Sequence, residues 1–72
     1  LAEAERLYRE SLAIDREIGD RQGEAASLNG LGIIARTRGD LAEAERLQRE
    51  SLAIKRDIGI PMVGGEFFEQ FG

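Results

Sequence analysis

Apolar residues recur through the first eighteen positions at the three- to four-residue spacing of an amphipathic helix. They are Leu1, Ala4, Leu7, Tyr8, Leu12, Ala13 and Ile18. Between them, residues of opposite charge stand four positions apart, which brings their side chains together on a helix surface. These pairs are Glu5–Arg9 and Arg6–Glu10. The pattern predicts a helix over residues 1–18.

The same spacing continues over residues 21–38 and 41–58. Each of the three segments is followed by a glycine, which takes the left-handed C-cap conformation at low cost: Gly19, Gly39 and Gly59. Asp20 and Asp40 then stand at N-cap positions. Asp40 with Glu43 three residues later resembles a capping box. The sequence therefore predicts three helices joined by short turns.

The apolar residues of the segment 21–38 are spread around much of the predicted helix. They are Leu28, Leu31, Ile33, Ile34 and Ala35. A helix that is apolar on more than one side is buried against more than one neighbour. Gly23 and Gly30 lower its intrinsic helix propensity, so packing must stabilise it. We expect this helix to be the inner one.

The chain contains a duplication. Residues 1–20 and 41–60 are the same except at four positions: Tyr8 against Gln48, Asp15 against Lys55, Glu17 against Asp57, and Asp20 against Ile60. The offset of 40 residues lies in the range of solenoid repeats. Units of such an array bury their apolar faces against neighbouring units.

The C-terminal residues fit the same repeat. Shifted back by 40 positions, Phe68 falls on Leu28 and Phe71 falls on Leu31. Residues 60–72 are therefore expected to begin a further inner helix. The predicted fold class is all-α, with about four helices. The expected organisation is one unit, 1–72, made of the second helix of one repeat (1–19), a complete repeat (20–59) and the start of another (60–72).

These residue types and spacings resemble the tetratricopeptide repeat. The matching positions are Leu28, Leu31 and Gly32 in its first helix, Gly39 in its turn, and Ala44, Ser51 and Leu52 in its second helix. Gly32 and Ala44 stand where that family uses small residues to let paired helices approach closely. The pattern covers residues 24–57, and within it residues 25–54 are similar to the longer variant of about 40 residues found in kinesin light chains and bacterial signalling regulators. Three positions depart from the pattern and predict a less filled contact between helices: Ala35, Gln48 and Arg56.

The resemblance implies antiparallel helix-turn-helix units stacked in a right-handed superhelix, with the first helices lining a concave groove. In that family the groove holds an extended peptide or a partner helix, and the domain is a binding module without catalysis. We therefore expect a protein or peptide partner. Carried onto this chain, the groove-facing positions are Ala26, Asn29, Ile33, Arg36 and Thr37. Their spacing of three to four residues also places them on one helical face.

Three features in this region have alternative interpretations. The Asn29 amide can bond the backbone of an extended peptide, or instead a neighbouring helix or water. Arg36 can clamp a carboxylate, but we favour a solvated side chain that interacts with the dipole at the end of its helix. Residues 38–40 spell the adhesion tripeptide Arg-Gly-Asp, yet a helix end, its cap and the next N-cap explain all three.

Composition narrows the function further. The net charge of −4 argues against nucleic acid, which requires a basic footprint. Cysteine and histidine are both absent, so thiolate chemistry, most zinc sites and the commonest general base are missing. The serines therefore lack an activating base, and we expect the Glu/Arg-rich faces to be solvated. We expect a cytoplasmic protein with no catalytic residue, no metal or cofactor, and no membrane partner.

A second function, of a different class, is structural self-association by homo-oligomerisation or domain swapping. A two-unit chain can barely supply the core that its ordering requires. Without a covering helix, Leu1, Leu7 and Leu12 would be exposed, and a second copy could stack upon them. We expect either a homo-oligomer or a fragment of a longer repeat array.

Overall fold

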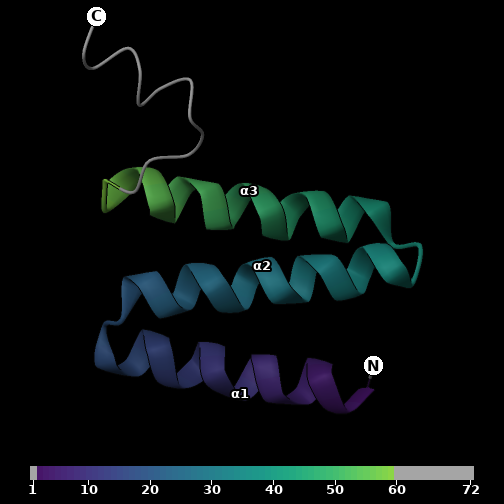
Figure 1. Cartoon of the computed structure of the whole chain (residues 1–72), viewed down its shortest axis with the longest axis horizontal. Coiled ribbons are helices and arrows are strands. Elements are labelled where there is room, and N and C mark those ends of the chain that lie inside the picture. Colours follow the sequence, from purple (N-terminus) through teal and green to yellow (C-terminus); the bar gives the residue numbers. More distant parts are fainter. Residues whose placement is uncertain (1, 60–72) are drawn as a thin grey trace, which may run out of the picture.

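The computed structural model describes residues 2–59, which form three α-helices: α1 (Ala2–Ile18), α2 (Arg21–Thr37) and α3 (Leu41–Asp57). The helices lie side by side and each runs antiparallel to the next, with α2 in the middle (Figure 1). This arrangement confirms the predicted all-α repeat architecture. The further helix expected in residues 60–72, and the predicted role of Leu1, lie outside the described residues. Within residues 2–59, no helix is long and apolar enough to cross a membrane.

The turns between helices close as the glycines predict. Gly19, Gly39 and Gly59 have φ angles of 77°, 87° and 80°, the left-handed region in which a side chain would be strained. After α2, the Gly39 N–H donates to the Arg36 carbonyl (2.9 Å) and the Asp40 N–H donates to the Ala35 carbonyl (2.9 Å). This pair of bonds is the Schellman motif, which satisfies carbonyls left open at a helix end.

The N-caps are also as predicted, but the capping box is not. The Asp20 carboxylate accepts from the Gly23 N–H (2.9 Å), and the Asp40 carboxylate accepts from the Glu43 N–H (3.3 Å). A capping box further requires the Glu43 carboxylate to bond the Asp40 N–H. That N–H is already used to close α2, and the Glu43 carboxylate binds Arg46 instead, at 2.6 Å.

The core lies between α2 and the two helices beside it. Its buried residues come from α2 and α3, and Leu12 of α1 packs against them. They are Ala25, Leu28, Leu31 and Ala35 of α2 with Ala44, Leu47 and Ile54 of α3. None of the described residues of α1 is itself buried. The expectation that α2 is the inner helix is confirmed. The expectation that Leu12 is exposed is wrong, because Leu12 is partly buried against this core.

The duplicated sequences occupy different environments. Leu47 is 6% exposed, whereas its counterpart Leu7 is 50% exposed. Ser51 shows the same contrast with Ser11: its buried hydroxyl donates to the Ala25 carbonyl at 2.8 Å, while Ser11 is exposed. α3 therefore packs on α2 through one face, whereas α1 packs on α2 through another face, the one that carries Leu12.

Two glycines of α2 allow its neighbours to approach closely. A Cβ atom on Gly32 would lie 2.8 Å from the Gln48 amide nitrogen, and one on Gly30 would lie 2.5 Å from Cζ of Tyr8. The first contact confirms the small-residue role predicted for Gly32. The second contact was not predicted: Gly30 weakens the helix, as expected, but it also leaves room for the Tyr8 ring.

We expect Ser51→Ala to lower the free energy of unfolding by about 1 kcal/mol, because a buried hydrogen bond is lost. Ser11→Ala is the matched control, since it makes the same change in helix propensity at an exposed copy of the position. Thermal unfolding should therefore separate the two variants by about 4–8 °C. Equal melting temperatures would contradict the role given to the Ser51 bond.

We expect Gly30→Ala to destabilise the fold by about 1–3 kcal/mol, because the new methyl group overlaps the Tyr8 ring. In a chain that carries Tyr8→Ala, the overlap is gone and alanine is the better helix former by about 1 kcal/mol. The same substitution should then stabilise the protein. Chemical denaturation of the four variants of this cycle would reveal the change of sign, and its absence would refute the contact.

Candidate functional site

The five positions predicted to face a partner lie on one accessible side of the middle helix. We call Ala26, Asn29, Ile33, Arg36 and Thr37 the α2 row. Ile33 is 52% exposed, whereas the next residue, Ile34, is buried. Asn29 is half-buried, and the other three are exposed. The structure thus brings the predicted residues together on a surface that another molecule can reach.

The polar groups of the α2 row differ in how far they are already engaged. The Thr37 hydroxyl donates to the Ile33 carbonyl at 3.0 Å, one turn earlier in the same helix. Arg36 takes part in none of the ion pairs between residues 2–59. A guanidinium without a partner can offer its donors to an incoming carboxylate. Arg36 therefore has the greatest capacity for a new charged contact.

A hollow of about 490 Å³ lies beside the α2 row, between α2 and α3, and Arg36 belongs to its lining. The other lining residues are Leu41, Ala44, Glu45, Gln48, Arg49 and Leu52. Glu45 and Arg49 form an ion pair at 2.9 Å, while Leu41 and Leu52 remain exposed. These α3 residues were not predicted from the sequence, because the predicted row lies on a single helix. The available signal was that Leu41 and Leu52 are apolar but lie off the face of α3 that buries Ala44, Leu47 and Ile54.

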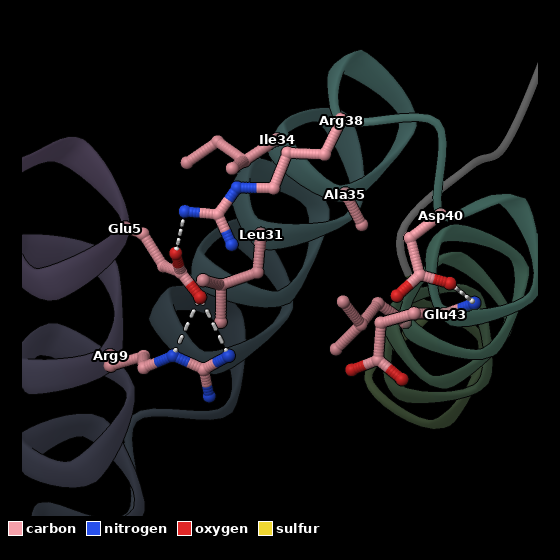
Figure 2. A pocket seen from close by; sticks show the side chains of 9 residues that line it. Glu5, Arg9, Leu31, Ile34, Ala35, Arg38, Asp40 and Glu43 are labelled. Carbon is pink, nitrogen blue, oxygen red and sulfur yellow. Dashed lines mark hydrogen bonds and ion pairs between the residues drawn. The ribbon is translucent and has the colours of Figure 1, made fainter. Parts of the chain in front are cut away.

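A second, smaller hollow lies on the other side of α2, between α1 and α3 (Figure 2). Its volume is about 170 Å³, and Ala35 is in its wall, where the tetratricopeptide pattern usually has a large aromatic residue. Glu5 of α1 lies between two arginines here: Arg9 at 2.9 Å, and Arg38, the residue that follows α2. The hydrogen bond from Arg9, followed by the charge of Arg38, lowers the pKa of Glu5. The ion pairs of Glu5 with Arg9 and Arg38 join the residues that line this hollow.

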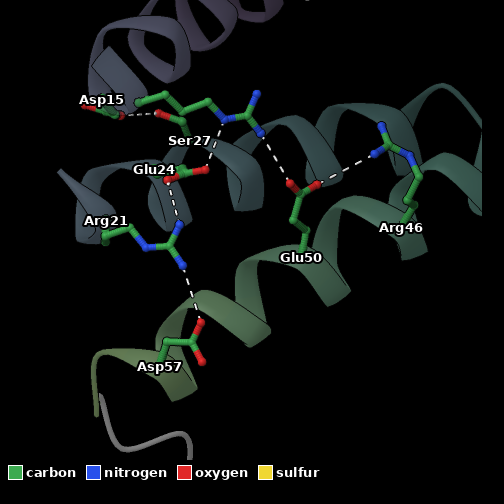
Figure 3. Close-up of polar contacts among 8 residues, drawn as sticks. Asp15, Arg21, Glu24, Ser27, Arg46, Glu50 and Asp57 are labelled. Atoms are coloured by element: carbon green, nitrogen blue, oxygen red, sulfur yellow. Dashed lines mark hydrogen bonds and ion pairs between the residues drawn. The ribbon is translucent and has the colours of Figure 1, made fainter. Parts of the chain in front are cut away.

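A network of ion pairs connects all three helices at the opposite end of α2 (Figure 3). Glu24 accepts from Arg16 of α1 at 3.0 Å and from Arg21 at 3.4 Å. Arg16 also reaches Glu50 of α3 at 3.2 Å, and Arg21 reaches Asp57 of α3 at 3.4 Å. The expectation that the charged faces are solvated is wrong for Glu24, which is 7% exposed. Two arginines offset the cost of burying that carboxylate.

These charged clusters have a structural explanation. Ser27 donates to the Asp15 carboxylate at 3.2 Å, and Ser51 donates to a backbone carbonyl, so both hydroxyls are engaged within the fold. In the described part of the chain, no group of three acidic, histidine or cysteine residues is placed to hold a metal ion. The α2 row with its adjacent hollow remains the candidate recognition surface.

Comparison with known proteins gives one finding. The family model described as tetratricopeptide repeat matches residues 1–57, which include all three helices. Domains of this family generally mediate protein–protein interaction and are typically non-catalytic scaffolds. Neither the search of curated proteins nor the search of solved structures found a match.

We expect Glu5→Gln to lower the melting temperature at neutral pH, because it removes the charge that links α1 to Arg38. A folded pKa below the ordinary value of 4.5 stabilises the protein above that value, and the stabilisation is lost as the pH falls through the folded pKa. The melting temperatures of the unmodified protein and of Glu5→Gln should therefore converge as the pH falls through the folded pKa of Glu5.

Glu45→Gln is the control for this experiment, because Glu45 is the duplicate of Glu5 but, among residues 2–59, pairs only with Arg49 of its own helix. At pH 7, Glu45→Gln should lower the melting temperature less than Glu5→Gln does. If both variants behave alike across the pH range, the contact between Glu5 and Arg38 does not contribute to stability.

Proposed function

Since this chain belongs to the tetratricopeptide repeat family, we propose that it is a protein-interaction module whose α2 row binds a peptide or an extended partner segment. The observation that carries the proposal is the position of the row. α2 is packed against a helix on each side (Figure 1), yet four residues of the row are exposed and Asn29 is half-buried. Because α2 is held between two helices, the backbone that carries the row need not be ordered when a ligand binds.

Asn29 supplies the part of recognition that does not depend on the ligand's sequence. A side-chain amide offers one acceptor and two donors, which matches the pattern of a peptide backbone. Asn29 is half-buried between the exposed positions of the row, so its side chain has less freedom to lose on binding than a fully exposed one. This environment supports a role as the central contact.

Arg36 and the hollow beside it supply selectivity. The guanidinium borders a space whose lining includes the exposed side chains of Leu41 and Leu52. A ligand segment with an apolar side chain in that space and a carboxylate near Arg36 would fill the hollow and pair with the guanidinium. The proposed ligand is therefore an extended segment with an acidic residue next to an apolar one.

Self-association is the second candidate function, and a separate observation favours it. α1 leaves large apolar side chains exposed, among them Ile14 at 54% and Ile18 at 68%. Exposed apolar patches commonly mark protein contacts. The two functions use different surfaces: a dimer formed through α1 would leave the α2 row free.

We expect Asn29→Ala and Arg36→Gln each to weaken binding of a fluorescent peptide, selected from a random peptide array, by about tenfold or more. A factor of ten corresponds to about 1.4 kcal/mol, the size of one hydrogen bond to a charged or well-placed group. Titration by fluorescence anisotropy measures the affinity, and thermal unfolding of the same variants should show no loss of stability.

Arg56→Gln is the matched control, because Arg56 is also an exposed arginine outside the ion pairs of residues 2–59 but lies on α3. It should leave the affinity unchanged. The proposal fails if the α2 variants bind the peptide as the unmodified chain does, or if binding and melting temperature fall together.

A further inference from the structure

Two adjacent residues of α2 can react with each other. Asn29 is the only asparagine of the chain, and Gly30 follows it directly. No aspartate of the chain precedes a glycine, so this is its only Asn–Gly or Asp–Gly pair. Asparagine is one of the chemically labile residues of proteins. The pair lies within the α2 row, at the half-buried position that we propose as the central contact.

The reaction open to this pair is deamidation through a cyclic imide. The Gly30 backbone nitrogen attacks the side-chain carbonyl carbon of Asn29, and a new C–N bond closes a succinimide ring. The C–N bond of the side-chain amide breaks, and ammonia leaves with the proton of the Gly30 nitrogen. Water then opens the ring at either carbonyl, which yields aspartate or isoaspartate. Glycine favours ring closure, because it has no side chain to hinder the attack and its backbone turns freely.

The helix keeps the two reacting groups apart. Asn29 and Gly30 lie near the middle of α2, where each backbone N–H is used in the hydrogen-bond ladder of the helix. The Gly30 nitrogen would have to leave this ladder and turn toward the Asn29 side chain. The residues on either side of the pair, Leu28 and Leu31, are 1% and 4% exposed. Such a turn would therefore pull buried leucines out of the core.

α1 adds a second restraint on the same peptide unit. Gly30 is buried, and a Cβ atom there would lie 2.5 Å from Cζ and 2.6 Å from Cε1 of Tyr8. The tyrosine ring thus lies directly against the Gly30 backbone and limits its displacement. Asn29 and Gly30 can reach the geometry of the attack only where α2 separates from its neighbours.

We infer that Asn29–Gly30 is a deamidation site controlled by the opening of α2. The pair is unreactive while α2 lies between α1 and α3, and it reacts when this packing opens. The rate of deamidation therefore follows the fraction of molecules in which α2 is locally unfolded. The stability of the helix packing sets the chemical lifetime of Asn29.

Neither product restores the original surface. An ionised aspartate accepts hydrogen bonds but donates none, so it lacks the two donors of the Asn29 amide. Isoaspartate adds a methylene group to the main chain, which puts the flanking parts of α2 out of register with the helical ladder. The reaction therefore removes the central contact of the α2 row, and refolding does not restore it. This consequence rests on the proposed function, whereas the reaction itself does not.

Incubation of the whole chain at slightly alkaline pH, with and without urea, tests the control by the fold. Peptide mapping by mass spectrometry measures the loss of Asn29 and the gain of aspartate and isoaspartate. The rate in urea should be higher by about tenfold or more, because the folded chain opens only part of the time. Gln22–Gly23 is the internal control, since its longer side chain would have to close a larger ring. It should stay intact in both samples.

Variants test whether opening sets the rate without urea. Ser51→Ala removes a bond between α3 and α2 and should raise the rate by about fivefold. Ser11→Ala, at the exposed copy of this position, should leave the rate unchanged. Tyr8→Ala should also raise the rate, because the ring no longer lies on Gly30. Adding Gly30→Ala to Tyr8→Ala should suppress the reaction, with and without urea, since the new side chain hinders ring closure.

Three results would overturn the inference. They are loss of Asn29 as fast in the folded chain as in urea, persistence of Asn29 in urea, and equal rates for Ser51→Ala and Ser11→Ala. Peptide binding is measured separately, by anisotropy on an Asn29→Asp chain, which should lose the array peptide as Asn29→Ala does. A chain that deamidates as expected while Asn29→Asp keeps its affinity would support the inference and refute the peptide contact proposed for Asn29.

Discussion

The fold depends on the enclosure of one helix by two others. α2 has apolar residues around most of its circumference, and such a helix cannot be stable with only one neighbour. α1 covers one side and α3 the other, and the glycines of α2 let both approach closely. The burial of Glu24 follows from this arrangement: its carboxylate is enclosed with the helix and requires the two arginines that reach it from α1 and α2. The α2 row is the part of α2 that neither α1 nor α3 covers.

The duplication shows that burial is a property of position in the array rather than of the residues. Leu7 and Leu47 stand in nearly the same sequence, with Tyr8 after one and Gln48 after the other, but Leu7 is half exposed and Leu47 lies in the core. The repeated helix sequence has two faces that can pack on α2. α3 uses the face that carries Leu47 and Ile54, whereas α1 uses the face that carries Leu12, which is why α1 has exposed isoleucines and α3 does not bury Leu52.

Local features could be predicted from the sequence because each depends on a few neighbouring residues. The three helices, their glycine ends and their aspartate N-caps are of this kind, and so is the position of the α2 row on one face. Features that depend on how one helix is rotated against another were missed or wrong. The Tyr8 ring on Gly30, the contact of Leu12 with the core and the burial of Glu24 all require that rotation. The capping box failed for a related reason, since the Asp40 N–H is shared between the end of one helix and the start of the next.

The near identity of α1 and α3 has a consequence for how such a chain can change over generations. An in-frame gain or loss of 40 residues adds or removes one whole unit, and the new junction reuses side chains that already fit one another. Tyr8 and Gln48 limit this exchange of units, because each packs against a different glycine of α2. Divergence at such positions gives each unit a fixed neighbour and makes later reshuffling of the array more costly.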